Sequence, residues 1–410
     1  MGKIIYVYAD WVAESPRLMG KLYSDVIRGT ENFSFEYDDT WLESQSKGLV
    51  YDADIEFFKG RQFLSDDKLI FGMFADSSPD RWGRMLLQRR ESVLAREEKR
   101  KPSKLMESDY LLGVYDEARM GGLRFSLEEG GPFLSFDEKL AIPPRVDLRR
   151  LESASMHIES EDDGLQKKWL DQLLIPGSSL GGARPKATVR DEKGELWIAK
   201  FPSKNDEHDV GAWEMVVHDL AKACGLRVPD ARLEYFSKNG GTYLAKRFDR
   251  DGDRRVHFAS AMTMLGKQDM DKDAGYLDIT EFIRSHSINA TSDLMELWKR
   301  MVFNMAVSNS DDHLRNHGFI LTGKGWMLSP VYDVNPIPFG DTLSLDILPG
   351  ENQNDMELAL ESAKYYGISV KEAKEMIEDI SKTVKEGWQT VAKGYKLSRS
   401  DMEYMRPAFE

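Results

Sequence analysis

The sequence predicts an α+β protein in which strand-rich sequence precedes mostly helical sequence. Period-two alternation of apolar residues marks strands near the start of the chain. Two hairpin signatures lie near its middle, and helical spacing dominates after Asp251. With 410 residues the chain is too long for one ordinary core. We therefore expect several domains, with limits at 1–125, 126–165, 166–250 and 251–410.

The composition is that of a globular, soluble chain. Hydrophobic residues make up 41% and charged residues 31% of the sequence. No apolar run approaches the ~20 residues that a membrane span needs, so we expect no membrane partner. The start, Met1–Asp10, is too short and too early charged for a secretory signal. The single Cys224 excludes an internal disulfide framework and a cysteine-rich zinc site, and a reducing cytoplasm is the expected setting.

The charge balance argues against direct nucleic-acid binding as the main activity. The formal net charge is -14, which should repel a polyanion on average. One local exception is the basic stretch 89–104, which contains Arg89, Arg90, Arg96, Lys99, Arg100, Lys101 and Lys104. A solvated helix face explains this stretch most simply, and a surface for an acidic or nucleic partner is the alternative.

Residues 1–125 are predicted to form a mixed α/β unit. The alternation in 4–8 and 33–37 favours strands. Ser78-Pro79-Asp80 predicts a helix start, with Ser as the N-cap, Pro at the first helical position and Asp in the first turn. We expect this helix to end near Arg100, before Pro102.

The elements that follow alternate hairpins with one helix. Charged, irregular sequence at about 136–166 indicates a connection in which a short helix is an option. Glycine-containing turns at 191–194 and 239–241 predict two hairpins. The apolar spacing from His208 to Cys224 predicts a helix that stops at Gly225. The predicted hairpin strands cover 187–189, 196–200, 232–236 and 242–248.

A small-residue segment precedes the first of these hairpins. Residues 177–186 read Gly-Ser-Ser-Leu-Gly-Gly-Ala-Arg-Pro-Lys. Such residues let backbone N–H groups approach phosphate oxygens closely, and the two Ser hydroxyls and Lys186 offer further contacts. The segment is neither a G-x-G-x-x-G nor a Walker A sequence, so a flexible linker stays open as the alternative. The candidate phosphate contacts are Ser179, Gly181, Gly182, Ala183 and Lys186.

Lys200 ends the second strand of that hairpin among apolar residues. A Lys in such a place must reach a counter-charge or lose its charge, unless it extends to solvent. In protein kinases a Lys at this point contacts ATP phosphates and pairs with a Glu on the next helix. Glu214 lies on the predicted next helix and suits this ion pair.

The strongest chemical signal is Asn309-Ser310-Asp311-Asp312-His313-Leu314-Arg315-Asn316, followed by Asp333. Protein kinases use this order: an Asp receives the substrate hydroxyl proton, and an Asn and a later Asp hold Mg²⁺. Mg²⁺ is a hard cation that prefers oxygen ligands. Predicted strands at 318–321 and 326–330 should bring the Asn and the second Asp to one edge.

Other interpretations of this stretch stay open. His313 suits a phosphate contact as well as a structural role. The Asp-Asp-His group also fits a metal-dependent phosphohydrolase, and a solvated acidic turn is the simplest alternative. The apolar segment 301–307 argues against that turn, because it places the group at the end of a buried helix.

Taken together, these motifs resemble the HipA family of bacterial serine/threonine kinases, which are toxins of toxin–antitoxin pairs. The resemblance covers nearly the whole chain. Its motifs are the loop 179–186, the Arg-Phe-Asp-Arg element at 247–250, the Asn-x-Asp-Asp-His-x-x-Asn element at 309–316, and Pro-x-Tyr-Asp-Val at 330–334. The segments 33–41 and 76–84 resemble that family's amino-terminal domain.

The resemblance implies a two-lobed protein-kinase-like fold and a role for each motif. Asp311 would be the catalytic base, and Asn316 and Asp333 would hold Mg²⁺. Lys200 would hold ATP phosphates, and the backbone at Lys246 and Phe248 would meet adenine. The loop serine would be autophosphorylated, and Ser179 is the matching position, with Ser178 as the alternative.

The resemblance also implies partners. Family members phosphorylate protein substrates such as aminoacyl-tRNA synthetases, and a small helix-turn-helix antitoxin (HipB-like) that binds operator DNA holds them inactive. DNA would then be reached only through the antitoxin. The alternative is a catalytically weak, nucleotide-binding module that acts as a corepressor in an antitoxin–DNA complex. The presence of Asp311 favours the kinase.

Overall fold

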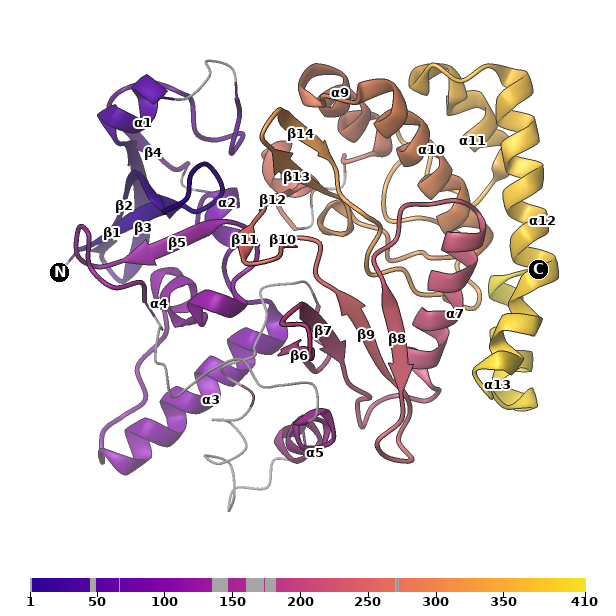
Figure 1. Cartoon of the computed structure of the whole chain (residues 1–410), viewed down its shortest axis with the longest axis horizontal. Helices are drawn as coiled ribbons and strands as arrows, with labels where there is room; N and C mark the ends of the chain where they lie inside the picture. The colour runs from indigo at the N-terminus through magenta and orange to yellow at the C-terminus, as the bar shows by residue number, and fades with distance from the viewer. Residues whose placement is uncertain are drawn as a thin grey trace. The chain divides into compact units, whose positions relative to one another are not determined.

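The computed structural model describes residues 2–44, 49–65, 67–134, 147–159, 173, 182–269, 271 and 273–410. The chain divides into two compact units. The first unit consists of Met1–Lys204 and Arg247–Ala259, and the second of Asn205–Lys246 and Ser260–Glu410. Figure 1 labels the helices and strands of both units. The domain limits expected from the sequence stay predictions.

A five-stranded antiparallel sheet forms the start of the first unit. Its order is β4-β3-β2-β1-β5, so β1 lies between β2 and β5. Alternate residues such as Ile5, Val7, Leu22 and Phe35 are buried, as period-two patterning requires. The strands predicted at 4–8 and 33–37 are confirmed within β1 and β3. The sheet strands are β1 Lys3–Ala9, β2 Arg17–Ile27, β3 Thr30–Tyr37, β4 Arg61–Phe63 and β5 Leu123–Ser126.

The helix predicted to begin at Ser78-Pro79-Asp80 is present, but its N-cap is Asp80 rather than Ser78. The Asp80 side chain accepts the Gly83 N–H, whereas the Ser78 hydroxyl donates to the Phe74 carbonyl. Asp is as good an N-cap as Ser, and its negative charge also suits the positive end of the helix dipole. Asp80, the later of the two residues, therefore takes the N-cap position. The helices of this unit are α1 Asp39–Ser44, α2 Gly72–Ala75, α3 Arg81–Glu97, α4 Glu107–Gly113, η1 Asp116–Ala118 and α5 Leu148–Glu159.

The first predicted hairpin is confirmed in the same unit. β6 pairs antiparallel with β7, and Lys186 lies directly opposite Lys200 in the register. Asp191 holds the turn between them, because its carboxylate accepts the Lys193 and Glu195 N–H groups. These strands and the short ones after them are β6 Lys186–Arg190, β7 Leu196–Lys200, β10 Arg250–Asp251, β11 Arg254–Arg255 and β12 His257–Ser260.

The Arg-Phe-Asp-Arg element forms a buried ionic cluster within the first unit. Asp249 accepts hydrogen bonds from Arg247 at 2.6 and 2.8 Å, from Arg250 at 2.6 Å and from the Gly121 N–H at 2.8 Å. The side chains of Arg247 and Asp249 are fully buried. Burial alone would raise the pKa of Asp249, but the charges of Arg247 and Arg250 outweigh it and lower this pKa. The cluster therefore holds the segment around Gly121 against 247–250.

His257 makes the stability of the first unit depend on pH. Its ring is buried and stacks on Trp11 with centroids 4.2 Å apart, and burial lowers the pKa of His257 to about 3. The unfolded chain binds this proton more tightly, so stability is complete above about pH 6.5 and is lost as the pH falls toward 3. We expect a loss of about 2 kcal/mol between pH 8 and pH 5, measured by denaturant unfolding.

A His257→Phe variant keeps a ring against Trp11 but cannot take up the proton. It should lose this part of the pH dependence. The same pH profile in the variant and the wild type would contradict the assignment to His257.

The second unit consists of the β8–β9 hairpin, the β13–β14 hairpin and a set of packed helices (Figure 1). The predicted helix 208–224 and hairpin around 239–241 are confirmed as α7 and β8–β9. Its elements are α7 Val210–Ala223, β8 Ala231–Glu234, β9 Thr242–Lys246, α8 Ala261–Met264, α9 Tyr276–His286, α10 Ala290–Ala306, η4 Leu314–Asn316, β13 Gly318–Thr322, β14 Gly325–Leu328, α11 Met356–Ser362, η5 Ala363–Tyr366, α12 Val370–Gly394, α13 Arg399–Met405 and η6 Arg406–Ala408.

Aromatic packing fixes the long helix α12 in this unit. α12 packs against α7 and α10. The Trp388 ring on α12 stacks on the Phe409 ring, with centroids 5.0 Å apart. The Trp213 ring on α7 stacks on the same Phe409 ring, with centroids 5.8 Å apart. Large rings bury much apolar area, so these contacts carry much of the packing energy between the helices. They hold α12 against α7.

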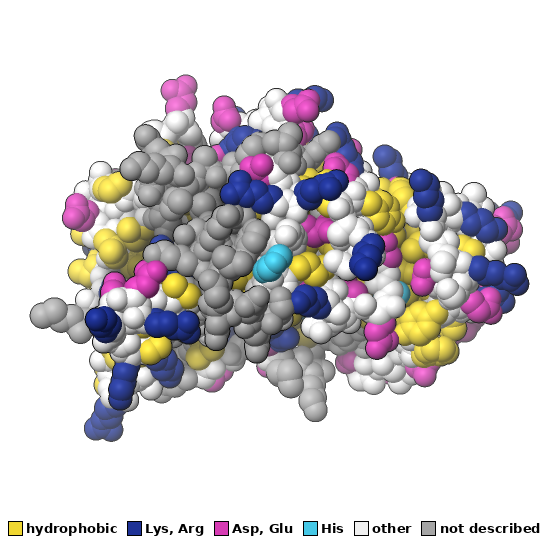
Figure 2. Space-filling model, turned by 90° about the horizontal axis from the view of Figure 1, so that it is seen from below, with side chains coloured by type: hydrophobic (Ala, Val, Ile, Leu, Met, Phe, Trp, Pro, Cys, Tyr) yellow, Lys and Arg dark blue, Asp and Glu magenta, His cyan; other side chains and the backbone are white. Residues whose placement is uncertain are grey.

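The surface shows charges of both signs. In Figure 2, dark-blue Lys and Arg side chains and magenta Asp and Glu side chains are scattered over the visible face. In the basic stretch 89–104, Arg100 contacts Glu91 and Glu98, which favours the solvated helix face over a landing surface. Within the described part of the chain, no helix has the length and apolar character to cross a membrane.

Candidate active site

The chain leaves helix α10 along a fixed path. Ser308 has a left-handed backbone, with φ 49°, directly after the helix. The Asn309 N–H then donates to the Asn304 carbonyl at 2.8 Å, and its side-chain amide donates to the Asn304 side-chain oxygen at 3.1 Å. Both Asn residues are buried. Because buried amides need partners, this pair sets the direction in which the loop continues.

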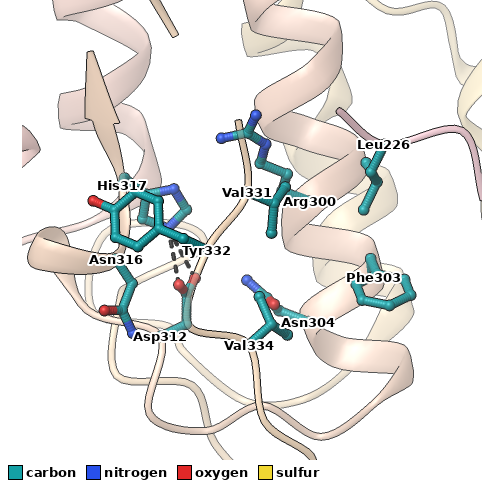
Figure 3. Close-up of a pocket in the computed structure, with 10 residues that line it drawn as sticks. All are labelled: Leu226, Arg300, Phe303, Asn304, Asp312, Asn316, His317, Val331, Tyr332 and Val334. Atoms are coloured by element: carbon teal, nitrogen blue, oxygen red, sulfur yellow. Dashed lines mark hydrogen bonds and ion pairs between the residues drawn. The ribbon is translucent and has the colours of Figure 1, made fainter. Parts of the chain in front are cut away.

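Asp312 fixes the loop through contacts with buried side chains. Its carboxylate accepts a hydrogen bond from the Tyr276 hydroxyl. It also lies 3.0 Å from His317 Nε2, a contact that Figure 3 draws as dashed lines. The Asn304 amide in turn donates to the Tyr276 hydroxyl at 3.3 Å. All four side chains are buried. They come from α9, α10 and the two ends of the loop, so the network ties the loop to the helices.

The electrostatics keep this anchor charged. Burial would raise the pKa of Asp312, but His317 and the Tyr276 hydroxyl outweigh it, so this pKa is lowered. Burial first, and then the Asp312 charge, raise the pKa of Tyr276 well above its ordinary value. At neutral pH Asp312 is therefore ionised and Tyr276 protonated, the states in which their hydrogen bond is strong.

Asp311 differs from its neighbour Asp312 in exposure, which indicates a different role. It is exposed, whereas Asp312 is 2% exposed. The Asn316 amide nitrogen donates to the Asp311 carbonyl at 3.0 Å and so closes the loop between the two residues. Since that nitrogen is engaged, the amide oxygen of Asn316 is the atom suited to a cation. The loop thus presents a carboxylate at the surface and an amide oxygen at its end.

The hairpin after the loop brings Asp333 back. β13 and β14 are antiparallel, with Phe319 opposite Leu328, so the chain enters β13 and leaves β14 at the same end. The Tyr332 hydroxyl donates to the Arg315 carbonyl at 2.6 Å, which ties the returning segment to the loop. Asp333 itself has φ 59°, a left-handed conformation that Asp tolerates better than most residues. The predicted return of the two segments to one edge is confirmed.

A small pocket lies behind the loop. Its volume is about 10 Å³, about the room of one water molecule. Figure 3 shows that polar groups of Asp312, Asn316 and His317 share it with apolar side chains, such as Phe303 of α10 and Val331 of the segment after β14. The residues that line it are Leu226, Arg300, Phe303, Asn304, Asp312, Asn316, His317, Val331, Tyr332 and Val334. A nucleotide does not fit this space, so the pocket belongs to the support of the loop.

The residue types at the loop are compatible with Mg²⁺. This ion commonly takes one or two protein oxygens and fills its other positions with water and phosphate oxygens. Asn316 and Asp333 carry oxygen donors of this kind, and their role as metal ligands stays a prediction. Among the described residues, no group of three or more His, Cys, Asp or Glu side chains gathers in a way that could hold a metal ion.

Comparison with known proteins identifies the family. Residues 178–388 of the 410-residue chain match the family model of the HipA-like C-terminal domain, which is just over half of the chain. The chain belongs to the HipA family. The fold agrees: the HipA–HipB–operator DNA structure from Shewanella oneidensis MR-1 superposes with a TM-score of 0.69 at 16% identity, over 98% of this chain and 94% of that one. The predicted α+β, HipA-like kinase fold is confirmed.

Curated relatives of this HipA-family chain carry the name of kinases. A Haemophilus influenzae protein named "Putative kinase" is 28% identical over 206 residues, which are 43% of this chain and 60% of the relative. A Sinorhizobium fredii protein, "Putative kinase Y4mE", is 30% identical over 148 residues, 33% of each chain. The chain thus spans between a third and three fifths of the length of these relatives.

The HipA-type phosphate loop lies partly outside the described residues. Ser178, Ser179 and Gly181 are in that part. Gly182 has φ 98°, a conformation that favours glycine, and Ala183 is exposed. Lys186 is buried and lies 3.0 Å from Asp80. The proposed phosphate contacts of these residues stay predictions.

The other residues that the HipA motifs assign to nucleotide binding lie in or next to the strands and the helix that the sequence predicts. Lys200 is half-buried at the end of β7, and Glu214 is 4% exposed on α7. The Lys246 N–H donates to the Asp230 carbonyl at 2.8 Å, and Phe248 follows β9. The ion pair of Lys200 with Glu214 and the adenine contacts stay predictions.

One ring nitrogen of His313 is available for a hydrogen bond. Its Nδ1 is buried and has no hydrogen-bond partner among the described residues. Buried polar atoms are rarely left without a partner, so this atom is a candidate for a ligand or water contact. The predicted phosphate contact of His313 is one way to meet this need.

The residues that hold the loop in place were not predicted from the sequence. Tyr276, Asn304, Asn309 and His317 were assigned no role, and Asp312 was considered only as part of the Asp-Asp-His group. Asn304 did carry a signal, because a polar residue within the apolar segment 301–307 must find a partner when it is buried. Tyr276 carried none, since nothing in its own neighbourhood points to a residue so far along the chain.

Proposed function

We propose that the chain is an ATP- and Mg²⁺-dependent serine/threonine protein kinase. The observation that carries this proposal is the loop itself. A buried network around Asp312 fixes it, Asp311 is exposed on it, and the Asn316 side chain closes it onto the Asp311 carbonyl. A base must be accessible to meet a substrate hydroxyl, and a rigid support keeps it in position.

In this proposal Asp311 is the catalytic base. Its carboxylate accepts the proton of a Ser or Thr hydroxyl, and the hydroxyl oxygen forms a bond to the γ-phosphorus of ATP. The bond from that phosphorus to the β-phosphate oxygen breaks, and ADP leaves. Positioning and charge stabilisation provide most of the acceleration in phosphoryl transfer, so the fixed loop is the main contribution of the protein.

Asn316 and Asp333 would hold Mg²⁺, which neutralises phosphate charge when it is bound. Lys200 would contact the phosphates, and Glu214 would orient Lys200. Gly182, Ala183 and the His313 ring would add phosphate contacts, and the backbone at Lys246 and Phe248 would meet adenine. Each of these roles comes from the motif that the residue occupies in the HipA family.

The most direct experiment measures transfer of the γ-phosphate. The purified chain is incubated with labelled ATP, Mg²⁺ and a protein extract or a candidate aminoacyl-tRNA synthetase. We expect label on Ser or Thr of a protein, with ADP formed in step. ADP formation without labelled protein would contradict a kinase and favour a phosphohydrolase.

Autophosphorylation is a second expected outcome. The HipA-type loop serine at Ser179, with Ser178 as its alternative, should gain one phosphate when the chain is incubated with ATP and Mg²⁺. Intact mass and peptide mapping measure this. A dianionic phosphate among the loop's backbone donors would compete with ATP, so activity should fall as the phosphate accumulates. No phosphate on either serine would contradict the expectation.

The proposal includes a helix-turn-helix antitoxin as partner. The Shewanella oneidensis HipA was solved with HipB and operator DNA, and a similar fold supports a similar partner here. DNA would be contacted through the antitoxin, because this chain carries a net charge of -14. A short helix-turn-helix protein encoded beside this chain, and its co-purification with the chain, would test the partnership.

A further inference from the structure

A buried ion pair joins the predicted phosphate loop to helix α3. Lys186 Nζ lies 3.0 Å from Asp80 Oδ2, and their side chains are 2% and 3% exposed. The contact is an ion pair by distance rather than a well-aligned hydrogen bond. Two charges taken out of water are tolerated only when they stay together, and removing one leaves the other uncompensated. Neither partner can therefore be lost without an effect on its surroundings.

A second contact joins the same two segments. The Trp82 N–H, in the first turn of α3, donates to the Gly182 carbonyl at 3.4 Å. A Cβ at Gly182 would come within 3.2 Å of Lys186 Nζ, so the loop folds closely over the ammonium group. Residues 182–186 are thus held at both ends by the beginning of α3, through Trp82 at one end and Asp80 at the other.

The sheet register explains why Asp80 is needed. Lys186 and Lys200 lie directly opposite each other on β6 and β7. Side chains of directly opposite residues extend from the same face of a sheet, and like charges there repel. The Asp80 carboxylate offsets the charge of Lys186 and so lessens that repulsion. Lys186 is thus held by α3, and Lys200 is the lysine that the family motif assigns to phosphate.

We propose that Asp80 is a positioning residue for nucleotide binding, which acts by anchoring the arm 182–186 of the phosphate loop through Lys186. This inference rests on the proposed function, since it assumes that the loop binds ATP phosphates. It also changes the role of Lys186 from a phosphate contact to the anchor of the loop. Asp80 itself touches no substrate.

Amide hydrogen exchange tests the anchor without nucleotide. Asp80→Asn removes the charge but keeps the helix start, because Asn and Asp cap helices equally well. We expect exchange in residues 182–190 to rise about tenfold in this variant, with residues 231–246 of the second unit unchanged. Unchanged protection of 182–190 would overturn the inference.

Nucleotide affinity tests the consequence. The dissociation constant of ADP with Mg²⁺ is measured by calorimetry for the wild type, Asp80→Asn, Lys186→Met and the double variant. We expect each single variant to bind about tenfold more weakly and the double variant to bind no more weakly than either, because the two residues act as one unit. Lys186→Arg, which keeps the ion pair, should bind like the wild type.

Glu91→Gln is the matched control. Glu91 lies in the second half of the same helix α3 and accepts a hydrogen bond from Arg100 at 3.1 Å, and this variant should bind nucleotide normally. With a protein substrate, Asp80→Asn should raise KM for ATP while kcat at saturating ATP stays within about twofold, whereas a general folding defect would lower kcat.

The outcomes separate the two proposals. Nucleotide binding by Asp80→Asn that equals or exceeds that of the wild type would overturn the inference alone. Weaker binding by Lys186→Met with normal binding by Asp80→Asn would show that Lys186 contacts phosphate directly, and would also overturn it. A wild-type chain that binds no nucleotide would overturn the proposed function, and the inference with it.

Discussion

Replacement of Asp311 by Asn is expected to lower the rate of phosphoryl transfer by about 10³-fold, the usual contribution of a general base. Asn keeps the size of the side chain but cannot accept the substrate proton. Because Asp311 is exposed and its carbonyl, rather than its side chain, bonds Asn316, the loop should keep its conformation. Steady-state transfer of labelled phosphate measures the effect, and circular dichroism and thermal unfolding check the fold.

Asp379→Asn is the control for this experiment. Asp379 is exposed on α12 of the same unit and has the same chemistry. It should transfer phosphate at the wild-type rate. Wild-type activity of Asp311→Asn would remove Asp311 from the reaction and, with it, the proposed role of the loop.

Replacement of Asp249 by Ala is expected to produce the largest loss of stability. Asp249 is fully buried and holds Arg247, Arg250 and the Gly121 N–H. Its loss leaves two guanidinium groups buried without their main counter-charge. Breaking a buried pair in this way costs about 3–5 kcal/mol. Calorimetry or urea unfolding of the first unit measures the change.

An exposed ion pair of the same unit provides the control. Asp39 lies 2.6 Å from Lys59, and both side chains are mostly exposed. Asp39→Ala should leave the unfolding midpoint unchanged, because water and salt screen such pairs. Equal midpoints for Asp249→Ala and the wild type would show that the buried cluster is not what holds the segment around Gly121.

Local patterns predicted most of the elements, because their signals lie within a few residues. The turn sequences at 191–194 and 239–241 predicted the β6–β7 and β8–β9 hairpins, and the spacing from His208 predicted α7. The start of α3 was predicted two residues too early. Ser78 and Asp80 are both good caps, and only the contacts of the folded chain decide between them.

The proposed catalytic set comes from order and spacing, but the residues that support its loop were not predicted. Asp311, Asn316 and Asp333 are close in sequence and have a recognisable chemistry. The Asp312 network depends on Tyr276 from α9 and Asn304 from α10, and only tertiary packing brings these residues together. In the same way, the pairing of Lys186 with Asp80 spans distant segments, so no local pattern could predict it.

The central claim is that Asn316 and Asp333 hold the divalent ion of a nucleotide complex. A crystal structure of the chain with ADP and Mn²⁺ tests it most directly, because the anomalous signal of Mn²⁺ locates the ion independently of the protein. We predict an Mn²⁺ ion bonded to Asn316 Oδ1 and to a carboxylate oxygen of Asp333. An ion bound elsewhere, with these two side chains free of it, would contradict the account.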